Sequence, residues 1–327
     1  EPEGDVLFEI FRDMMKLSDA DFSALRSLSR EGGGSRTIDQ LAVEKGHITV
    51  EQRDTFWRAY IERRLDEMRQ KLLGARIGSY QILEEIAAGG MGIVFKARQE
   101  SPMFTRETAL KFMLAGAEAG EEDRERFIAE VKGLASLSHP CLVHIFDSGI
   151  EGDLYYFSME LVDGWSLDGA EGVKALSSTR KVEVVRDIAR ALAYLHASGV
   201  VHRDVKPGNI MVDRQGAAKL LDFGIAQFSA DPRRRAVQAG TPYFMAPEVI
   251  APTGGFGPIG PGTDVYALGA VLYQLLFSRP VFDSPGGLGE VLAKTVHEPP
   301  RFPRRRGERI PSELERIISR CLKKRVS

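Results

Sequence analysis

Apolar residues recur at the spacing of one helix face in the first quarter of the chain. They are separated by arginine and glutamate, and they are Phe56, Trp57, Tyr60, Ile61, Leu65, Met68 and Leu72. We therefore predict a helix from about Val50 to Leu73. Its N-terminus is predicted at Thr49, because Gln52 follows three residues later and completes the pattern of a capping box.

The same segment contains a second, weaker copy of this helix start. Residues 17–21 resemble residues 48–52, and the glycine-rich stretch at 32–35 is suited to a flexible connector. We interpret residues 1–74 as a small all-α module made of two related helical hairpins. An aromatic stripe at helical spacing is more often core than ligand site, so the pattern assigns no chemistry to this module.

From residue 80 the pattern changes to short apolar runs that are typical of strands. Such runs occupy residues 80–83, 108–112 and 154–161. Glycines between the first two runs predict a turn whose backbone can approach phosphate closely, although an ordinary hairpin explains such a turn equally well. A longer apolar stretch that follows Asp264 predicts a helix ending near Phe277.

Residues 202–222 carry the side chains with the clearest chemistry. Residues 202–209 read HRDVKPGN, and residues 222–224 read DFG. Asp204 can sit beside an attacking hydroxyl, while Asn209 and Asp222 offer oxygen atoms suited to Mg²⁺. Phosphoryl transfer depends on such alignment and charge stabilisation more than on covalent catalysis. The first three residues alone are common in proteins, but the whole run is far more specific.

This run resembles the catalytic loop and magnesium-binding turn of the eukaryotic-like (Hanks-type) protein kinases, in particular the bacterial Ser/Thr branch. The resemblance starts near residue 79 and includes the APE motif at 246–248. It implies an α+β, two-lobe protein-kinase fold over 79–327. A small β-rich N-lobe with the hinge would occupy 79–162, and a large helical C-lobe would occupy 163–327.

The resemblance also implies a role for each residue near the transferred phosphoryl group. Asp204 would orient the acceptor hydroxyl, and Lys206 would neutralise the γ-phosphate. Thr241 would order this loop and favour a small hydroxyl side chain. Asn209 and Asp222 would bind Mg²⁺. The Lys-Pro pair that begins at Lys206 is similar to Ser/Thr kinases rather than to Tyr kinases.

ATP would bind between the glycine-rich turn and the hinge. Lys111 would hold the α- and β-phosphates, and Glu130 would position it. The expected ATP-binding residues are Ala87, Gly89, Gly90, Gly92, Val94, Ala109, Lys111, Met159, Glu160, Val162 and Met211. Ala87 departs from the family pattern, which has a glycine at this position. The extra methyl group restricts the turn but removes no charge and no metal ligand.

Two rival functions remain at this stage. A pseudokinase that senses nucleotide or acts as a scaffold is disfavoured, because every charged residue expected in the site is present. A small-molecule kinase of the aminoglycoside or choline type shares the His-x-Asp loop. Such enzymes lack the APE segment and usually lack the DFG motif, whereas this chain has both.

Composition narrows the partners and the location. The chain of 327 residues has 43% hydrophobic residues and a net charge of −2, which gives no electrostatic case for nucleic-acid binding. No apolar run reaches the length of a membrane span. The two cysteines are expected to be reduced thiols in the cytoplasm. We expect protein substrates, together with a regulatory partner or self-association through residues 1–74.

Two expectations concern regulation and extent. Ser229 is the only ordinary phosphosite candidate between Asp222 and Glu248. We therefore expect loop phosphorylation to matter less than in relatives with threonine-rich loops, and the helical module to carry more of the control. The family usually continues through an arginine that pairs with Glu248, so we expect this chain to be a fragment truncated within its C-lobe.

Overall fold

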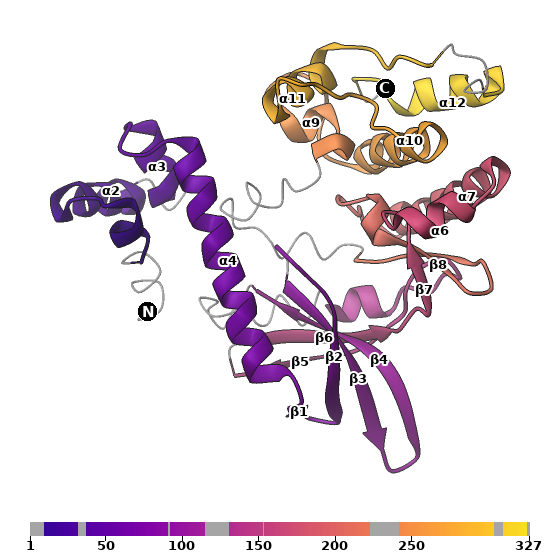
Figure 1. The fold of residues 1–327 in the computed structure, drawn as a ribbon, viewed down its shortest axis with the longest axis horizontal. Coiled ribbons are helices and arrows are strands. Elements are labelled where there is room, and N and C mark those ends of the chain that lie inside the picture. Colours follow the sequence, from indigo (N-terminus) through magenta and orange to yellow (C-terminus); the bar gives the residue numbers. More distant parts are fainter. Residues whose placement is uncertain are drawn as a thin grey trace. The chain divides into compact units, whose positions relative to one another are not determined.

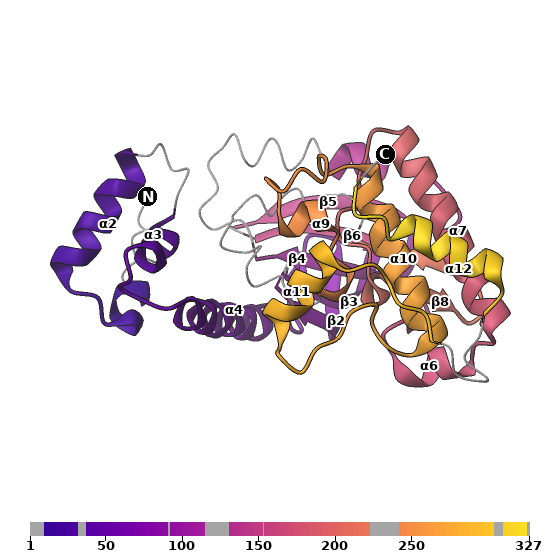
Figure 2. The same cartoon turned by 90° about the horizontal axis from the view of Figure 1, so that it is seen from above.

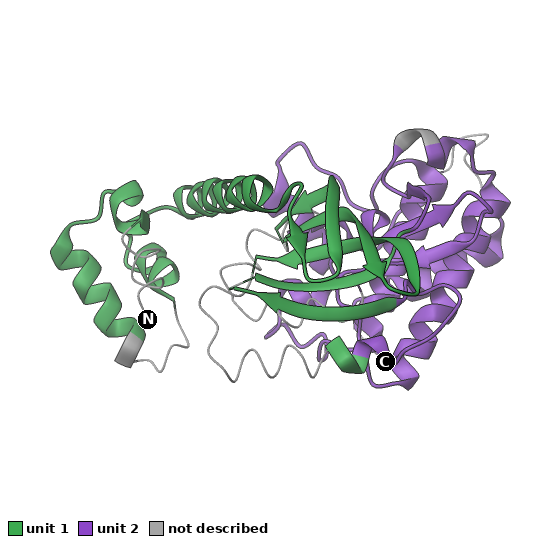
Figure 3. Ribbon diagram, turned by 90° about the horizontal axis from the view of Figure 1, so that it is seen from below, with its two compact units in different colours: residues 1–133, 145–161, 228–239 green, residues 134–144, 162–227, 240–327 purple. Residues whose placement is uncertain are grey.

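The computed structural model describes residues 10–31, 37–90, 92–114, 131–152, 154–222, 242–303 and 310–325. The chain divides into two compact units (Figure 3). The first comprises residues 1–133, 145–161 and 228–239, and the second comprises residues 134–144, 162–227 and 240–327. No helix in the described part of the chain is long and apolar enough to cross a membrane.

The first unit begins with a group of helices. A short helix at 10–15 precedes α2 (Asp19–Glu31), and α3 (Ile38–Glu44) precedes the long helix α4 (Val50–Leu72). The backbone N–H of Gln52 donates to Thr49 Oγ1 at 3.1 Å, and Thr49 N–H donates back to Gln52 Oε1 at 2.8 Å. These bonds confirm the predicted capping box and the predicted start of α4.

An antiparallel six-stranded sheet follows α4. Its strands are β1 (Arg76–Ile77), β2 (Tyr80–Gly89), β3 (Gly92–Ser101), β4 (Phe104–Met113), β5 (Ile145–Glu151) and β6 (Leu154–Glu160), in the order β1-β2-β3-β4-β6-β5. The apolar runs of the sequence therefore lie on β2, β4 and β6, as predicted. Figure 1 shows α4 leading from α2 and α3 at one of its ends to this sheet at the other.

The two faces of the sheet follow from its register, because residues paired across strands point to the same face. Lys111 pairs with Val94 and with Phe157, and these three define the Lys111 face. Phe112 pairs with Ile93 and lies on the opposite face, which we call the Phe112 face. The apolar residues of this face are buried under a helix.

Helix α4 supplies that cover with its C-terminal half. Leu65, Met68 and Leu72 are buried at intervals of three and four residues, so they share one side of the helix. They form one hydrophobic core with residues of the Phe112 face, including Tyr80, Ile82, Ile93, Phe95, Ala97, Leu110 and Phe112. The N-terminal half of α4 instead packs against α2 and α3 through Phe56 and Trp57.

The second unit is mainly helical. Its helices are α6 (Ala170–Ala175), α7 (Ser178–Ala197), η1 (Pro207–Asn209), η3 (Pro242–Phe244), α9 (Pro247–Ile250), α10 (Pro261–Phe277), α11 (Leu288–His297) and α12 (Ser312–Cys321). A three-stranded sheet joins β7 (Gly164–Ser166), β8 (Ile210–Asp213) and β9 (Ala218–Leu220). Figure 2 shows α10 and α12 beside each other, in agreement with their packing. A sheet-bearing unit and a helical unit confirm the predicted two-lobe fold.

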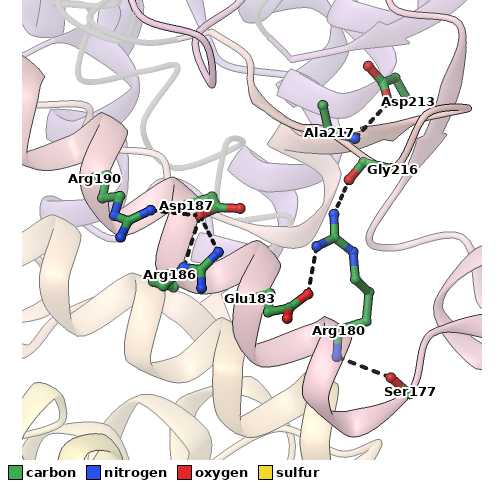
Figure 4. A network of polar contacts seen from close by, with 9 residues as sticks. All are labelled: Ser177, Arg180, Glu183, Arg186, Asp187, Arg190, Asp213, Gly216 and Ala217. Atoms are coloured by element: carbon green, nitrogen blue, oxygen red, sulfur yellow. Dashed lines mark hydrogen bonds and ion pairs between the residues drawn. The ribbon is translucent and has the colours of Figure 1, made fainter.

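Polar contacts connect the start of α7 to the turn between β8 and β9 (Figure 4). Ser177 Oγ caps α7 by accepting from Arg180 N–H at 3.2 Å. The Arg180 guanidinium donates to the Gly216 carbonyl and pairs with Glu183 at 2.7 Å. The catalytic loop leads through η1 directly into β8. These contacts therefore fix the turn at the C-terminal end of β8.

Candidate active site

His202 connects the catalytic loop to the segment that carries Asp222. Its side chain is fully buried, and its Nδ1 accepts from the backbone N–H of Asp204 at 3.2 Å. The hydrogen of a neutral ring is then on Nε2, which donates to the carbonyl of Leu221 at 2.8 Å. The buried ring of His202 therefore links the loop that carries Asp204 to the segment that carries Asp222.

Asp264 supports the backbone of the same loop from the first turn of α10. Its Oδ1 accepts from Arg203 N–H at 2.8 Å, and its Oδ2 accepts from His202 N–H at 2.8 Å and from His196 Nε2 at 2.7 Å. Arg203 has a φ of 67°, in the left-handed region that is uncommon for residues other than glycine. The Asp264 carboxylate therefore holds a backbone conformation that local preferences disfavour.

The Asp204 carboxylate is held by two neighbours in the loop. Lys206 Nζ lies 2.7 Å from Asp204 Oδ2, and Asn209 Nδ2 donates to the same oxygen at 2.9 Å. Asn209 Nδ2 also donates to the backbone carbonyl of Asp204 at 2.8 Å. Both side-chain contacts use Oδ2 rather than Oδ1.

Asn209 and Asp222 are brought together by a backbone hydrogen bond. Leu221 N–H donates to the Asn209 carbonyl at 2.8 Å, and Asp222 follows with a φ of 58°. Asn209 uses its Nδ2 on Asp204, so Oδ1 is the side-chain atom that it could offer to a metal ion. An amide oxygen and a carboxylate are hard donors that fit Mg²⁺, which takes its remaining ligands from water and substrate phosphates. The described residues contain no group of three or more His, Cys, Asp or Glu suited to a metal.

Strand pairing gathers five of the expected nucleotide-contacting residues of the first unit on the Lys111 face. Ala87 pairs with Val94, Val94 pairs with Lys111, and Ala109 pairs with Met159. Lys111 is only 3% exposed, which is unusual for a lysine and indicates a specific environment rather than a solvated strand face. These five residues come from four strands, of which β2, β3 and β4 follow one another in the sequence and β6 lies about forty residues later.

The glycines of the turn differ in what requires them. Gly92 has a φ of 144°, and a Cβ there would collide with the carbonyl oxygen of Phe112. Its identity is thus explained by the close approach of β3 and β4. A Cβ at Gly89 would meet nothing within 4 Å. The surrounding protein therefore does not itself require a glycine at position 89.

Other expected site residues are placed individually. Glu160 ends β6, Val162 follows it by two residues, and Met211 lies on β8. Gly90 lies in the turn between β2 and β3. Glu130, Thr241 and Ser229 lie outside the described residues, so their expected roles stay predictions.

Sequence reasoning missed a cavity beside the catalytic loop in the second unit. Its volume is about 400 Å³, and its lining residues include Lys206, Gly208, Tyr243, Gln274, Asp168 and Asp283. The two aspartates are exposed or half-exposed loop residues without a motif, so no signal in the sequence singled them out. Only the fold places them next to Lys206.

Comparison with known proteins matches residues 80–327 to the protein kinase domain. The chain belongs to the protein kinase family. The kinase is 35% identical over 259 residues to the serine/threonine-protein kinase PrkC of Bacillus subtilis, covering 77% of this chain and 39% of PrkC. It is 34% identical over 256 residues to PknB of Mycobacterium tuberculosis, covering 75% of this chain and 40% of PknB.

A third relative extends this group of bacterial kinases. The DNA damage-responsive serine/threonine-protein kinase RqkA of Deinococcus radiodurans is 36% identical over 259 residues, covering 76% of this chain and 37% of RqkA. The kinase thus spans about two fifths of the length of the curated relatives it matches. These matches confirm the sequence-based assignment to the bacterial Ser/Thr branch.

Proposed function

We propose that this kinase transfers the γ-phosphoryl group of ATP, with Mg²⁺, to serine or threonine hydroxyls of protein substrates in bacterial cytoplasmic signalling. The observation that carries the proposal is the arrangement around Asp204. Lys206 and Asn209 hold one oxygen of its carboxylate, and Asp264 holds the loop backbone on which it lies. This is a preorganised site for an acceptor hydroxyl.

In the proposed reaction, the acceptor oxygen forms a bond to the γ-phosphorus while the bond between that phosphorus and the ADP oxygen breaks. The hydroxyl proton passes to Asp204, for which we assign Oδ1. A carboxylate is a weak base, but proton transfer is late in a loose transition state, so the position of Asp204 matters more than its basicity. Lys206 places a positive charge beside the moving group.

The other residues bind and orient the nucleotide. Lys111 would contact the α- and β-phosphates, and Asn209 with Asp222 would hold Mg²⁺. When bound, Mg²⁺ neutralises charge on the phosphates. The donor set supports this assignment, because an amide and a carboxylate suit Mg²⁺ and the backbone hydrogen bond from Leu221 N–H to the Asn209 carbonyl brings their two segments together. Ala87 would replace the first glycine of the turn without loss of a charged contact.

The cavity beside Lys206 supports a protein as the acceptor. It is adjacent to the Lys206–Asp204 pair, and it is large enough to take a side chain of the segment that carries the hydroxyl. Residues 1–74 would add control, through a regulatory partner or self-association, because α4 joins this module to the sheet.

Phosphoryl transfer from labelled ATP with Mg²⁺ tests the proposal. Asp204→Asn should lower the rate by about 10²–10⁴-fold while Mg²⁺–ADP still binds, since Asp204 faces the acceptor. Asp187→Asn is a matched control, because among the described residues the ion pairs of Asp187 are with Arg186 and Arg190 on its own helix, α7. Equal rates for Asp204→Asn and wild type would refute the assignment. Nucleotide binding without any transfer by wild type would favour the pseudokinase alternative.

Magnesium binding is tested separately. Asp222→Ala should abolish the increase in ADP affinity that Mg²⁺ produces, because a direct metal ligand is lost. Titrations of ADP with and without Mg²⁺ in both proteins measure this. An unchanged magnesium effect in Asp222→Ala would remove Asp222 from the metal site.

A further inference from the structure

Arg69 on α4 forms an ion pair with Glu85 on β2, the strand that leads into the glycine-rich turn. Arg69 donates to both carboxylate oxygens of Glu85, with Nε at 2.7 Å from Oε2 and Nη2 at 3.1 Å from Oε1. The third guanidinium nitrogen, Nη1, lies 2.6 Å from Oδ1 of Asp66, which is one helical turn earlier on α4. The guanidinium is therefore oriented by Asp66 on its own helix and bound in two-point geometry to β2.

Arg69 is also held in place by the packing of its helix. Its neighbours Met68 and Leu72 are buried in the core that α4 shares with the Phe112 face of the sheet. The backbone after α4 continues this attachment, because Gln81 Nε2 donates to the Gly74 carbonyl at 2.9 Å. The helix is thus attached to the sheet on both sides of Arg69 along the chain, while the Arg69–Glu85 pair itself is partly exposed.

Glu85 occupies the least regular part of β2. The pairing of β2 with β3 shifts register between Ile82 and Glu84 and again between Glu85 and Ala87. Such bulges interrupt the ladder of backbone hydrogen bonds and change the direction of the strand. The hydrogen bonds of the sheet fix the direction of β2 less firmly at this point. A contact that holds Glu85 therefore helps to set the direction in which β2 enters the turn.

The position of Glu85 relative to the expected nucleotide contacts follows from the register. Glu85 pairs with Phe95 on the Phe112 face, toward α4, while Ala87 pairs with Val94 on the Lys111 face. The Arg69–Glu85 pair thus lies two residues before the first residue of the glycine-rich turn, and on the opposite face of the sheet. It cannot contact a nucleotide on the Lys111 face directly.

We propose that Arg69 is a positioning residue for the nucleotide, which acts by holding Glu85 and thereby the entry of β2 into the glycine-rich turn. The inference rests on the proposed role of this turn in binding ATP. It gives α4 a function as part of the catalytic lobe. It also supplies a route by which residues 10–60 act on nucleotide affinity, because a change in the seating of α4 moves Arg69.

Calorimetric titration of the full chain with Mg²⁺–ADP tests the proposal. Arg69→Ala should raise the Kd by about 2- to 5-fold, the effect that corresponds to a typical coupling of an exposed ion pair. Arg63→Ala is the matched control. Arg63 lies on the same helix and pairs with Glu67 at 3.1 Å, with no contact to β2. Its Kd should equal that of wild type.

Variants of Glu85 separate positioning from simple electrostatics. Glu85→Gln removes a negative charge near the expected phosphates, so a purely electrostatic effect would tighten binding. Loss of positioning weakens binding instead, as in Arg69→Ala. The pair Arg69→Ala with Glu85→Gln should be no weaker than either single change.

The rate at saturating ATP distinguishes positioning from a general loss of structure. It should stay within about twofold of wild type in Arg69→Ala, because Asp204 and its neighbours are untouched. Equal Kd values for Arg69→Ala, Arg63→Ala and wild type would overturn the proposal, as would tighter binding by Glu85→Gln. Failure of the wild type to bind Mg²⁺–ADP would instead overturn the proposed function on which it rests.

Discussion

Replacing Asp264 with asparagine should destabilise the kinase and slow phosphoryl transfer, although asparagine has almost the same shape. Asp264 is 1% exposed and accepts from two backbone N–H groups and from His196. The single oxygen of asparagine can replace Oδ1 or Oδ2, but not both. At least one N–H of Arg203 or His202 would then face the amide NH₂ group, which is itself a donor.

The magnitude follows from that count. A hydrogen bond to a charged group contributes about 1.5–3 kcal/mol, so the loss of at least one should lower the free energy of unfolding by about this amount. For a chain of 327 residues, the change corresponds to a fall in Tm of about 2–4 °C. If all of this free energy serves to position Asp204, kcat falls by about 10- to 150-fold.

Thermal unfolding and transfer of labelled phosphate at saturating ATP measure the two effects. Val265→Ala is the control, since Val265 is the next residue of α10 and is exposed. Mg²⁺–ADP binding should change little in Asp264→Asn, because the loop backbone at Arg203 acts on the acceptor side. An unchanged Tm and kcat would refute the reasoning. So would a loss confined to nucleotide affinity.

Two further outcomes test packing and titration. Leu72→Ala should lower the free energy of unfolding by about 2–5 kcal/mol, because Leu72 is fully buried under the sheet; Leu73→Ala, 56% exposed, should change it by less than about 0.5 kcal/mol in the same urea titration. Burial lowers the pKa of Lys324 to about 8. The unfolded chain then binds more protons than the folded chain between about pH 8 and pH 10.5, so stability should rise with pH across this window, and Lys324→Met should lack this rise in melting curves at about pH 7.5 and pH 9.5.

The sequence by itself determined the features that depend on local chemistry. The start of α4 was predictable because Thr49 and Gln52 satisfy each other's backbone groups within one turn of helix. The catalytic loop was predictable because its residues lie within one short run of sequence, so their spacing can be recognised without knowing the fold. The family match confirmed that this run indicates a protein kinase.

Only the tertiary structure decided which distant segments meet. The apolar stripe of α4 indicates that one side of the helix is buried, but the pattern is the same whichever surface covers it. The fold places Leu72 against Phe112 and sets Arg69 beside Glu85, two charged residues that look like ordinary solvated positions in the sequence. It also places Asp283 with Lys206 around one cavity.

The physical reason is the difference between local and long-range interactions. Capping, turn formation and helical spacing depend on neighbours within a few residues, so their signals are written in short stretches of sequence. Packing between segments depends on sheet register, on bulges such as those around Glu85, and on the direction of each side chain. These are properties of the assembled chain, and they decide here how a helix outside the matched kinase domain becomes attached to the sheet that carries Lys111.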